Sequence, residues 1–366
     1  MATVTRYVNT ASSGGDGTTN GTSGSTAAYA TLSAGLTAEA VDLVAAGDSI
    51  VFECDGTVDA TRATVSTSWT TGASNTITIR AATSAKHTGQ AATGYRLVPT
   101  TQSSGDHTLT INVGNVYVDG LEISVKSSTG YGQYGTYAVS VNGDGIYIDN
   151  CYIWYGNTSY LTHGIVHKAS GSTGTTKVYI TNTVVTGFTG EGISNREEGW
   201  GTTVEFYCDN CIVDRGGDDS GEGDTGLYYS NGYNTVFQCY NCMGGVLLPA
   251  ATDNWRVGGG TATFSGDYNW SVDTTGPGAS AVDSVTFTTS TGTGTRYIVE
   301  DLTSGAEDYM LTDHADNDAI DAGTSVGSSP SDDMLGTTRS SLDIGPFEVA
   351  AAASSAVKML STLGVG

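Results

Sequence analysis

Two Cys-x-x-Cys pairs are the residues whose types and spacing most directly suggest chemistry in this sequence. Cys208 and Cys211 form the first pair, and Cys239 and Cys242 form the second pair about 30 residues later. Four such thiols bind zinc when all the sulfurs converge on one ion at about 2.3 Å. They can also form a redox pair, or they can be buried, since free cysteine packs as a small apolar residue. The choice depends on the elements that carry them.

Acidic residues gather in two segments that could act on a carbohydrate. The segments are NREEGW, residues 195–200, and DRGGDDSGEGD, residues 214–224. Glycoside hydrolysis needs two carboxylates at about 5–5.5 Å or wider, and a lyase needs a base and acidic Ca²⁺ ligands. The catalytic candidates are Arg196, Glu197, Glu198, Asp218, Asp219 and Glu222, and the candidate platforms for stacking on a glycan are Trp200 and Tyr228.

A solvated turn explains the same acidic residues, and we favour that interpretation because Asp, Gly and Ser are typical turn residues. The acidic side chains could hold Ca²⁺ without catalysis, and no other cofactor or metal is predicted. His163 and His167 lie four residues apart, but on a predicted strand, where they need not share a metal. The sequence contains no Ser-His-Asp pattern, phosphate loop or dinucleotide fingerprint above chance. It therefore predicts no specific catalyst.

An internal repeat of about thirty residues accounts for the cysteines. Five segments align: NVYVDGLEI from Asn115, GIYIDNCYI from Gly145, KVYITNTVV from Lys177, EFYCDNCIV from Glu205 and VFQCYNCMG from Val236. Alternate positions within each segment are apolar, which is the period of a strand with one buried face. The sixth position is a corner residue, namely Gly120, Asn150, Asn182, Asn210 or Asn241.

This pattern predicts an all-β fold, a right-handed parallel β-helix whose neighbouring coils lie about 4.8 Å apart. The corner residues Asn150, Asn182, Asn210 and Asn241 are predicted to stack as a ladder of side-chain amides. The predicted core column of cysteines contains Cys151, Cys208, Cys211, Cys239 and Cys242. Because a corner separates the two thiols of each pair, we favour buried cysteines over zinc. Stacked positions also meet the Cα separation of a disulfide, so the oxidised form fits the same pattern.

The remaining chain is divided around these coils. A second strand series is predicted to point Val139, Ile165, Ile193 and Leu227 inward. One helix is predicted from Ser33 to Ala45, with Leu36, Ala40, Leu43 and Val44 on one face, to cover the open end of the stack. The predicted divisions are residues 1–48 (strand, loop and capping helix), 49–300 (coils), 301–349 (closing segment) and 350–366 (a small apolar tail, disordered or docking).

Composition and charge restrict the partners. The 366 residues include 14 Lys and Arg against 38 Asp and Glu, a formal net charge of −24. Such a surface repels nucleic acid and anionic membranes, so neither is expected as a partner. The 51 glycines and the low charged fraction of 14% are typical of many short strands joined by tight turns.

Several segments resemble right-handed parallel β-helix repeat proteins. YATLSAGL (29–36) with AAGDSIVFECDG (45–56) resembles their opening, in which a cap helix leads into the first strand. GDYNWSVDTTGPG (266–278), AIDAG (319–323) and GTTRSSLDIGPFE (336–348) resemble closing segments of bacterial surface β-helix proteins. Residues 7–34 resemble openings of bacteriophage and marine viral proteins of this type. The resemblance covers nearly the whole chain, and it implies a fold rather than one activity.

The start MATVTRYVNT lacks the charged segment and apolar core of a secretion signal. We therefore expect a virion protein, made in the host cytoplasm and exposed on a bacteriophage particle as a head decoration, fibre or spike subunit. The expected partners are other virion proteins, further copies of the chain (trimers are common among the spikes it resembles) and a host surface polysaccharide. The alternatives are a tailspike-type depolymerase, acting as a lyase or glycoside hydrolase, and a bacterial surface adhesin. The sequence favours a non-enzymatic role without deciding the matter.

Overall fold

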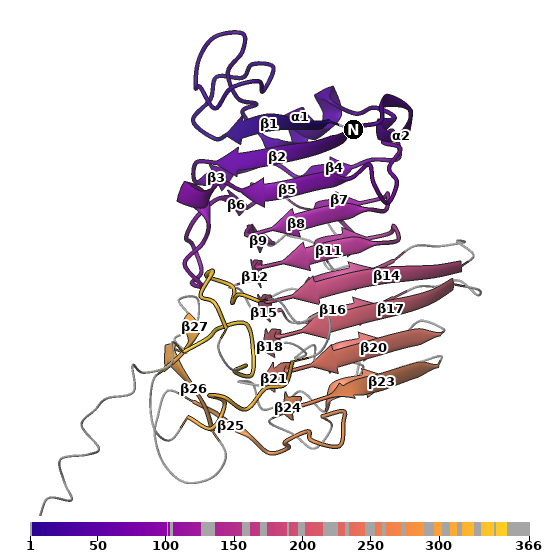
Figure 1. The fold of residues 1–366 in the computed structure, drawn as a ribbon, viewed down its shortest axis with the longest axis vertical. Coiled ribbons are helices and arrows are strands. Elements are labelled where there is room, and N and C mark those ends of the chain that lie inside the picture. The colour runs from indigo at the N-terminus through magenta and orange to yellow at the C-terminus, as the bar shows by residue number, and fades with distance from the viewer. Residues whose placement is uncertain are drawn as a thin grey trace, which may run out of the picture.

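β-Strands in three long parallel sheets make up most of the protein (Figure 1). The computed structural model describes residues 2–100, 102, 105–125, 136–155, 162–168, 174–188, 190–196, 202–214, 226–230, 234–245, 253–257, 261–271, 276–288, 296–301, 308–312, 317–325, 331–339 and 342–349.

The three sheets run side by side along the molecule, and we number them in the order in which the chain enters them. Sheet 1 contains β1 (Thr3–Asn9), β2 (Ser49–Asp55), β5 (Ile77–Ala81), β8 (Val116–Asp119), β11 (Ile146–Asp149), β14 (Gly174–Thr181), β17 (Thr202–Asp209), β20 (Thr235–Tyr240) and β23 (Ala262–Asp267). Sheet 2 contains β3 (Val58–Asp59), β6 (Arg96–Leu97), β9 (Glu122–Ser124), β12 (Tyr152–Trp154), β15 (Val184–Thr186), β18 (Ile212–Asp214), β21 (Met243–Gly245) and β24 (Trp270–Ser271). Sheet 3 contains β4 (Ala63–Val65), β7 (His107–Ile111), β10 (Thr136–Val141), β13 (Thr162–His167), β16 (Ile193–Asn195), β19 (Gly226–Ser230) and β22 (Asp253–Val257).

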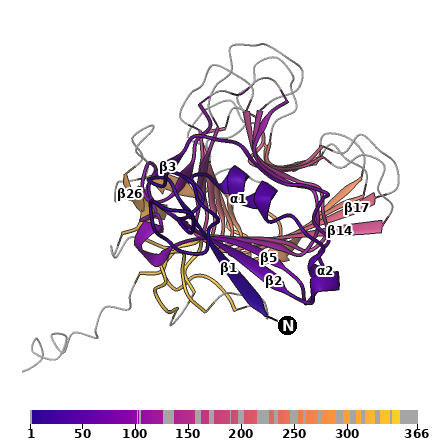
Figure 2. The same ribbon diagram turned by 90° about the horizontal axis from the view of Figure 1, so that it is seen from above.

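From β2 to β22, each coil contributes one strand to sheet 1, then one to sheet 2 and one to sheet 3, and the last described coil adds β23 to sheet 1 and β24 to sheet 2. Neighbouring coils pair in parallel, so that Ile146 lies beside Val116 of one coil and Val178 of the next. Seen along the stack, the three sheets enclose a common interior (Figure 2). The chain winds in the right-handed sense that parallel crossovers favour. The predicted all-β, right-handed parallel β-helix is therefore confirmed.

A residue in the left-handed conformation forms the corner between sheet 1 and sheet 2. The φ angles are 72° at Gly120, 51° at Asn150, 45° at Asn182, 53° at Asn210 and 53° at Asn241. Glycine reaches this region without strain, and asparagine is among the few other residues that tolerate it. The backbone of the corner thus explains why the repeat carries Gly or Asn at this position.

Alternate side chains fill the interior of the stack. In β11, Ile146 and Ile148 are buried, whereas the intervening Tyr147 is partly exposed. The rings of Phe206 and Phe237, one coil apart, stack with their centroids separated by 4.8 Å. Because neighbouring coils pair in register, each inward side chain packs against the side chain at the equivalent position of the next coil. The packing of one coil is therefore repeated in the next.

Two short helices cover the N-terminal end of the stack, instead of the single predicted helix. They are α1 (Leu32–Ala38), which Figure 2 shows over the interior, and α2 (Leu43–Ala46). The side chain of Asp42 accepts a hydrogen bond from the backbone N–H of Ala45 at 2.9 Å and so caps α2. An aspartate favours a new helix start over continuation of the preceding helix.

The helix break also separates the predicted apolar face. Leu36 and Leu43 are buried, as the helical spacing predicts, but Val44 is 49% exposed. The prediction of one continuous face from Ser33 to Ala45 is therefore wrong beyond Ala38, and the cap consists of α1 with the first residue of α2.

A short 3-10 turn, η1 (Thr83–Ala85), lies between β5 and β6.

One strand of sheet 3 differs in register from the prediction. The sequence places Leu227 in the inward column of Ile193, but the structure pairs Ile193 with Tyr228. Because side chains alternate between the faces of a strand, a shift of one residue exchanges the faces. Tyr228 therefore occupies the inward position.

After β24, the chain forms a small sheet and then turns back along the stack. The small sheet contains β25 (Thr286–Thr288), β26 (Arg296–Asp301) and β27 (Asp308–Leu311), with β25 and β26 parallel and β26 and β27 antiparallel. We call the segments 317–325, 331–339 and 342–349 the C-terminal strap. In Figure 1 the strap lies beside the coils, from about the middle of the stack toward the end opposite α1.

The strap helps to bury the outer face of sheet 2 in a second hydrophobic core. The residues that sheet 2 contributes are Tyr152, Val184, Ile212, Met243 and Trp270. The covering residues include Tyr309 of β27 and the strap residues Ala319, Met334, Ile344 and Phe347. Sheet 2 is thus buried on both faces, and its outer face also holds the buried carboxylate of Glu122.

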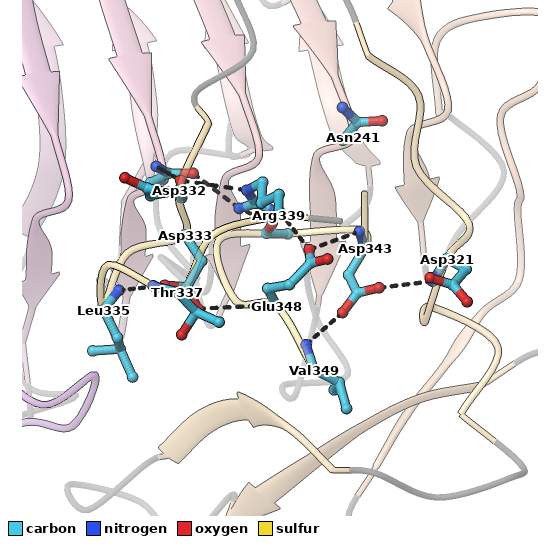
Figure 3. Close-up of polar contacts among 12 residues, drawn as sticks. Asn241, Asp321, Asp332, Asp333, Leu335, Thr337, Arg339, Asp343, Glu348 and Val349 are labelled. Carbon is cyan, nitrogen blue, oxygen red and sulfur yellow. Dashed lines mark hydrogen bonds and ion pairs between the residues drawn. The ribbon is translucent and has the colours of Figure 1, made fainter. Parts of the chain in front are cut away.

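Polar contacts tie the strap to the corner asparagines (Figure 3). Arg339 forms an ion pair with Glu348 at 3.2 Å, and its Nη2 donates to Oδ1 of Asn182 at 3.0 Å. The backbone N–H of Thr324 donates to Oδ1 of Asn241 at 2.8 Å. These contacts join the strap to coils separated by more than one turn.

None of the helices in the described residues is long and apolar enough to cross a bilayer.

Candidate functional site

The two Cys-x-x-Cys pairs lie inside the stack. Cys208 pairs with Cys239 in strand register, and Cys211 and Cys242 follow the corners of the same two coils. All six cysteines of the chain are free and buried. Sγ of Cys211 lies 3.3 Å from the carbonyl oxygen of Ile180, and burial raises the pKa of this thiol. In the part of the chain that the structure describes, no three His, Cys, Asp or Glu side chains are arranged to hold a metal ion.

The corner asparagines form an interrupted ladder. Nδ2 of Asn182 donates to Oδ1 of Asn150 at 3.2 Å, and Nδ2 of Asn150 donates to Oδ1 of Asp119 at 2.9 Å. Asn241 donates to a carboxylate one coil away and to a strap carbonyl, at 3.2 and 2.9 Å. The side chain of Asn210 is buried, and neither of its polar atoms has a hydrogen-bond partner among the described residues. The predicted amide ladder is therefore confirmed between Asn150 and Asn182 and wrong at Asn210 and Asn241, because Asn241 bonds a carboxylate and the strap instead and Asn210 bonds no described side chain.

Most of the catalytic candidates cannot be placed. Glu197, Glu198, Trp200, Asp218, Asp219 and Glu222 lie outside the described residues. The first acidic segment begins where β16 ends, at Asn195, and the second segment ends just before β19 begins, at Gly226. Asn195 pairs with Ser230, the last residue of β19. The end of β16 and the start of β19 therefore lie at opposite ends of the strands of sheet 3.

Arg196 is described, and a buried carboxylate holds it. Its Nε and Nη2 donate to Oε1 of Glu191 at 3.0 and 2.6 Å, and Oε2 of Glu191 contacts Nδ1 of His163. Burial alone would raise the pKa of Glu191, but the charges of His163 and Arg196 outweigh it and lower that pKa to about 2. An ionised, doubly paired carboxylate with no exposure is a poor proton donor or acceptor. This cluster positions Arg196 at the start of the first acidic segment.

Tyr228 cannot serve as a surface platform for a glycan. Its side chain has no solvent exposure. Its ring stacks on Trp255 with a centroid separation of 4.9 Å and meets Phe237 edge-on at 6.3 Å. The register shift in β19 is the reason, because it turns this tyrosine into the core.

The outer face of sheet 1 carries a row of stacked tyrosines that the sequence analysis missed. Tyr117, Tyr147, Tyr179 and Tyr207 occupy equivalent positions in β8, β11, β14 and β17, and all four are partly exposed. Successive ring centroids are 4.3, 4.6 and 4.9 Å apart, with interplanar angles of 3°, 6° and 15°. We call these four residues the tyrosine row. The sequence does indicate this row, because the third residue of four aligned segments is a tyrosine. The alternation of side chains along a strand places that third residue on the outer face.

Acidic residues run beside the tyrosine row, two residues further along the strands. We call Asp119, Asp149 and Asp209 the acidic column; Thr181 takes the equivalent place in β14. Asp149 accepts a hydrogen bond from Oγ1 of Thr181 at 2.5 Å, and burial raises its pKa. Asp209 is buried, whereas Asp119 and Asp149 are partly exposed. The face therefore combines phenol hydroxyls with two partly exposed carboxylates, which can hydrogen-bond a ligand rich in hydroxyl groups.

Comparisons with known proteins extend this description. The chain matches no protein-family model and no curated protein. Among solved structures it is similar to pectate lyase Pel9A, at 13% sequence identity and a TM-score of 0.43, over 94% of this chain and 96% of that chain. The class defined by the coordinates themselves is a parallel β-helix protein. Two features of this chain are the tyrosine row on sheet 1 and the strap on sheet 2.

Proposed function

We propose that this protein is a rigid structural component exposed on a bacteriophage particle, as a head decoration, fibre or spike subunit, and that it binds a host surface glycan without cutting it. The rigid rod follows from coils that share parallel strand ladders and a continuous core, since each coil is held by both of its neighbours.

The observation that carries the binding part of this proposal is the tyrosine row. Four equivalent phenol groups are presented in a line on the outer face of sheet 1. Aromatic side chains with a polar tip are enriched where proteins meet partners, because they provide contact area and hydrogen bonds at a small loss of conformational entropy. The virion location is supported by the resemblance of residues 7–34 to openings of bacteriophage proteins.

A polysaccharide depolymerase is the second candidate function. The observation that favours it is the position of Arg196, which two hydrogen bonds hold against Glu191 directly before the segment that contains Glu197 and Glu198. A guanidinium in a defined orientation can bind a carboxylate of an acidic sugar. The interpretation as a structural ion pair uses the same contacts, so the candidate needs a test of activity.

Electron microscopy of particles with and without this protein, with antibody labelling, tests the location. We expect labelled density on the outside of the particle, and particles that carry none of the protein would contradict the proposal. The purified protein is then incubated with host polysaccharide. New reducing ends or unsaturated sugars, abolished by Glu197→Gln or Asp219→Asn, would replace the binding function with the depolymerase. Location on a bacterial cell surface would instead favour an adhesin.

A further inference from the structure

We propose that the outer face of sheet 1 takes a neutral, linear polysaccharide that lies along the tyrosine row, parallel to the axis of the stack. This inference rests on the proposed function, because it names the class of glycan and the surface that binds it. It is argued from the orientation of the rings, the repetition of the face and the balance of charges on it.

The orientation of the rings determines which of their atoms a ligand can reach. Tyr147 is stacked between Tyr117 and Tyr179 at 4.3 and 4.6 Å, so both faces of its ring are covered. The row therefore presents ring edges and hydroxyl groups. The edge of an aromatic ring is electropositive, and a phenol both donates and accepts hydrogen bonds. Both features suit a ligand rich in oxygen atoms, and neither requires a sugar to stack on a ring face.

The repetition of the face favours a polymer over a small molecule. The four tyrosines belong to four successive strands of sheet 1 and lie in one line along the stack. Any single rung offers a ligand little contact area. An extended chain touches several rungs at once, and each added contact raises the overall affinity because the ligand is already held nearby.

The charges on this face select against an anionic glycan. Three cations at this face, among the residues that the structure describes, form ion pairs: Arg80 with Glu53 at 2.7 Å, Lys86 with Asp119 at 3.8 Å and Lys177 with Glu205 at 3.8 Å. The acidic column adds negative charge beside the row, and the whole chain has a formal net charge of −24. A uronic-acid polymer would be repelled. Two copies meeting through this face would bring their acidic columns together, which disfavours a second copy as the occupant.

Carboxylates beside the row do suit neutral sugars, because a carboxylate accepts hydrogen bonds from hydroxyl groups. The protein shows this arrangement within itself, where Oγ1 of Thr181 donates to Oδ1 of Asp149 at 2.5 Å. At one end of the row, the hydroxyl of Tyr207 donates to Oε2 of Glu205 at 2.6 Å. The hydroxyl of Tyr207 is therefore engaged, and that of Tyr147 also contacts its neighbour Tyr117. We centre the contact on Tyr147 and Tyr179, which lie in the middle of the row.

The test uses the full chain and calorimetry with soluble neutral glucan, mannan and galactan fractions of increasing length, with polygalacturonate as the anionic comparison. The variant Tyr147→Phe with Tyr179→Phe removes two hydroxyls and keeps the rings, so the melting temperature reports whether the fold is retained. The matched control is Tyr7→Phe, because Tyr7 is partly exposed on the same sheet, three strands before the row.

We expect a neutral polysaccharide to bind more tightly as its chain lengthens. We also expect the double variant to weaken binding about fivefold or more, as the loss of two neutral hydrogen bonds implies, and Tyr7→Phe to leave binding unchanged. Four results would overturn the inference: no neutral polymer binds, polygalacturonate binds as well, the double variant binds normally, or light scattering shows dimers that the double variant abolishes. None of these results tests whether the protein lies on the particle, which electron microscopy measures separately. Binding by a protein absent from particles would overturn the location alone.

Discussion

The side-chain amide of Asn182 donates a hydrogen bond to Oδ1 of Asn150, one coil away, at 3.2 Å. The same amide donates to the carbonyl of Asp332 at 3.0 Å, and its oxygen accepts from Arg339 at 3.0 Å. One corner residue thus joins two coils to the C-terminal strap. Asn210, at the next corner, has the same backbone conformation and none of these contacts.

This contrast predicts different effects of glycine at two equivalent corners. Asn182→Gly should lower the free energy of unfolding by about 2–3 kcal/mol, because it removes three hydrogen bonds, one of them to the buried guanidinium of Arg339. Asn210→Gly should change it by less than about 1 kcal/mol, because glycine suits a φ of 53° and no described hydrogen bond is lost. Urea denaturation of both variants measures the difference. Equal losses at the two corners would mean that the strap does not depend on Asn182.

The ion pair between Arg339 and Glu348 should be a major contributor to the stability of the strap. Both side chains are 2% exposed, and removal of one partner leaves the other charge buried. Arg339→Ala should therefore lower the free energy of unfolding by about 3–5 kcal/mol. The control is Arg80→Ala, whose pair with Glu53 is 47% and 27% exposed and should contribute about 0–1 kcal/mol. Denaturation curves that are the same for the two variants would contradict the position of the strap.

Glu122 should make the protein less stable as the pH rises. Its side chain is buried on sheet 2, and burial raises its pKa to about 7 although Ala92 and Trp154 donate hydrogen bonds to it. Below pH 4.5 the group is protonated in both states. Between pH 4.5 and 7 the unfolded chain loses the proton while the folded protein keeps it, so stability falls, and above pH 7 the loss is complete.

Glu122→Gln isolates this effect. Burial lowers the pKa of His107 and of His167 to about 4, so these residues make the native protein more stable as the pH rises from about 4 to 6.5. Their contribution cancels when the variant is compared with the native protein at each pH. The stability of the variant relative to the native protein should therefore rise by a few kcal/mol between pH 4.5 and 8, at about 1.4 kcal/mol per pKa unit. A difference that does not change with pH would contradict a raised pKa at Glu122.

The buried thiols should be inert in the native protein. All six cysteines are buried, and burial raises the pKa of Cys54 and Cys151. A thiol reagent such as Ellman's reagent should titrate none of them under native conditions and all of them in guanidinium chloride. Fewer than 6 reactive thiols after unfolding without reductant would show that stacked cysteines are joined by disulfides.

The coils could be predicted from the sequence because their signals are local and repeated. Alternation identifies the inward side chains, and the left-handed corner favours Gly or Asn at one position, although Tyr268 occupies the equivalent corner between β23 and β24 with a φ of 56°. The register of β19 could not be predicted in this way, since Leu227 and Tyr228 are both apolar enough to point inward and the preceding connection does not determine which one does. The strap was equally inaccessible, because Asn182 and Asp332, which it joins, are separated by 150 residues.

The sequence was less informative about the candidate site. The acidic segments attracted attention by composition, yet of their candidates the structure describes only Arg196, which is bound to Glu191. The tyrosine row occupies the third position of four aligned segments, at Tyr117, Tyr147, Tyr179 and Tyr207, whereas the apolar alternation that defines the coils lies at the inward positions. Outward positions that repeat the same aromatic residue are an equally direct signal, because coils in register must bring them together.

Hydroxyl-radical footprinting with mass spectrometry tests the central claim, that the tyrosine row is the recognition surface, most directly. The full chain is oxidised alone and with the host surface polysaccharide, and modification of Tyr147 and Tyr179 is compared with that of Tyr7. We predict that Tyr147 and Tyr179 are modified in the free protein and protected when the polysaccharide is bound, while Tyr7 is modified equally in both. Bound polysaccharide that leaves the modification of Tyr147 and Tyr179 unchanged would contradict the account.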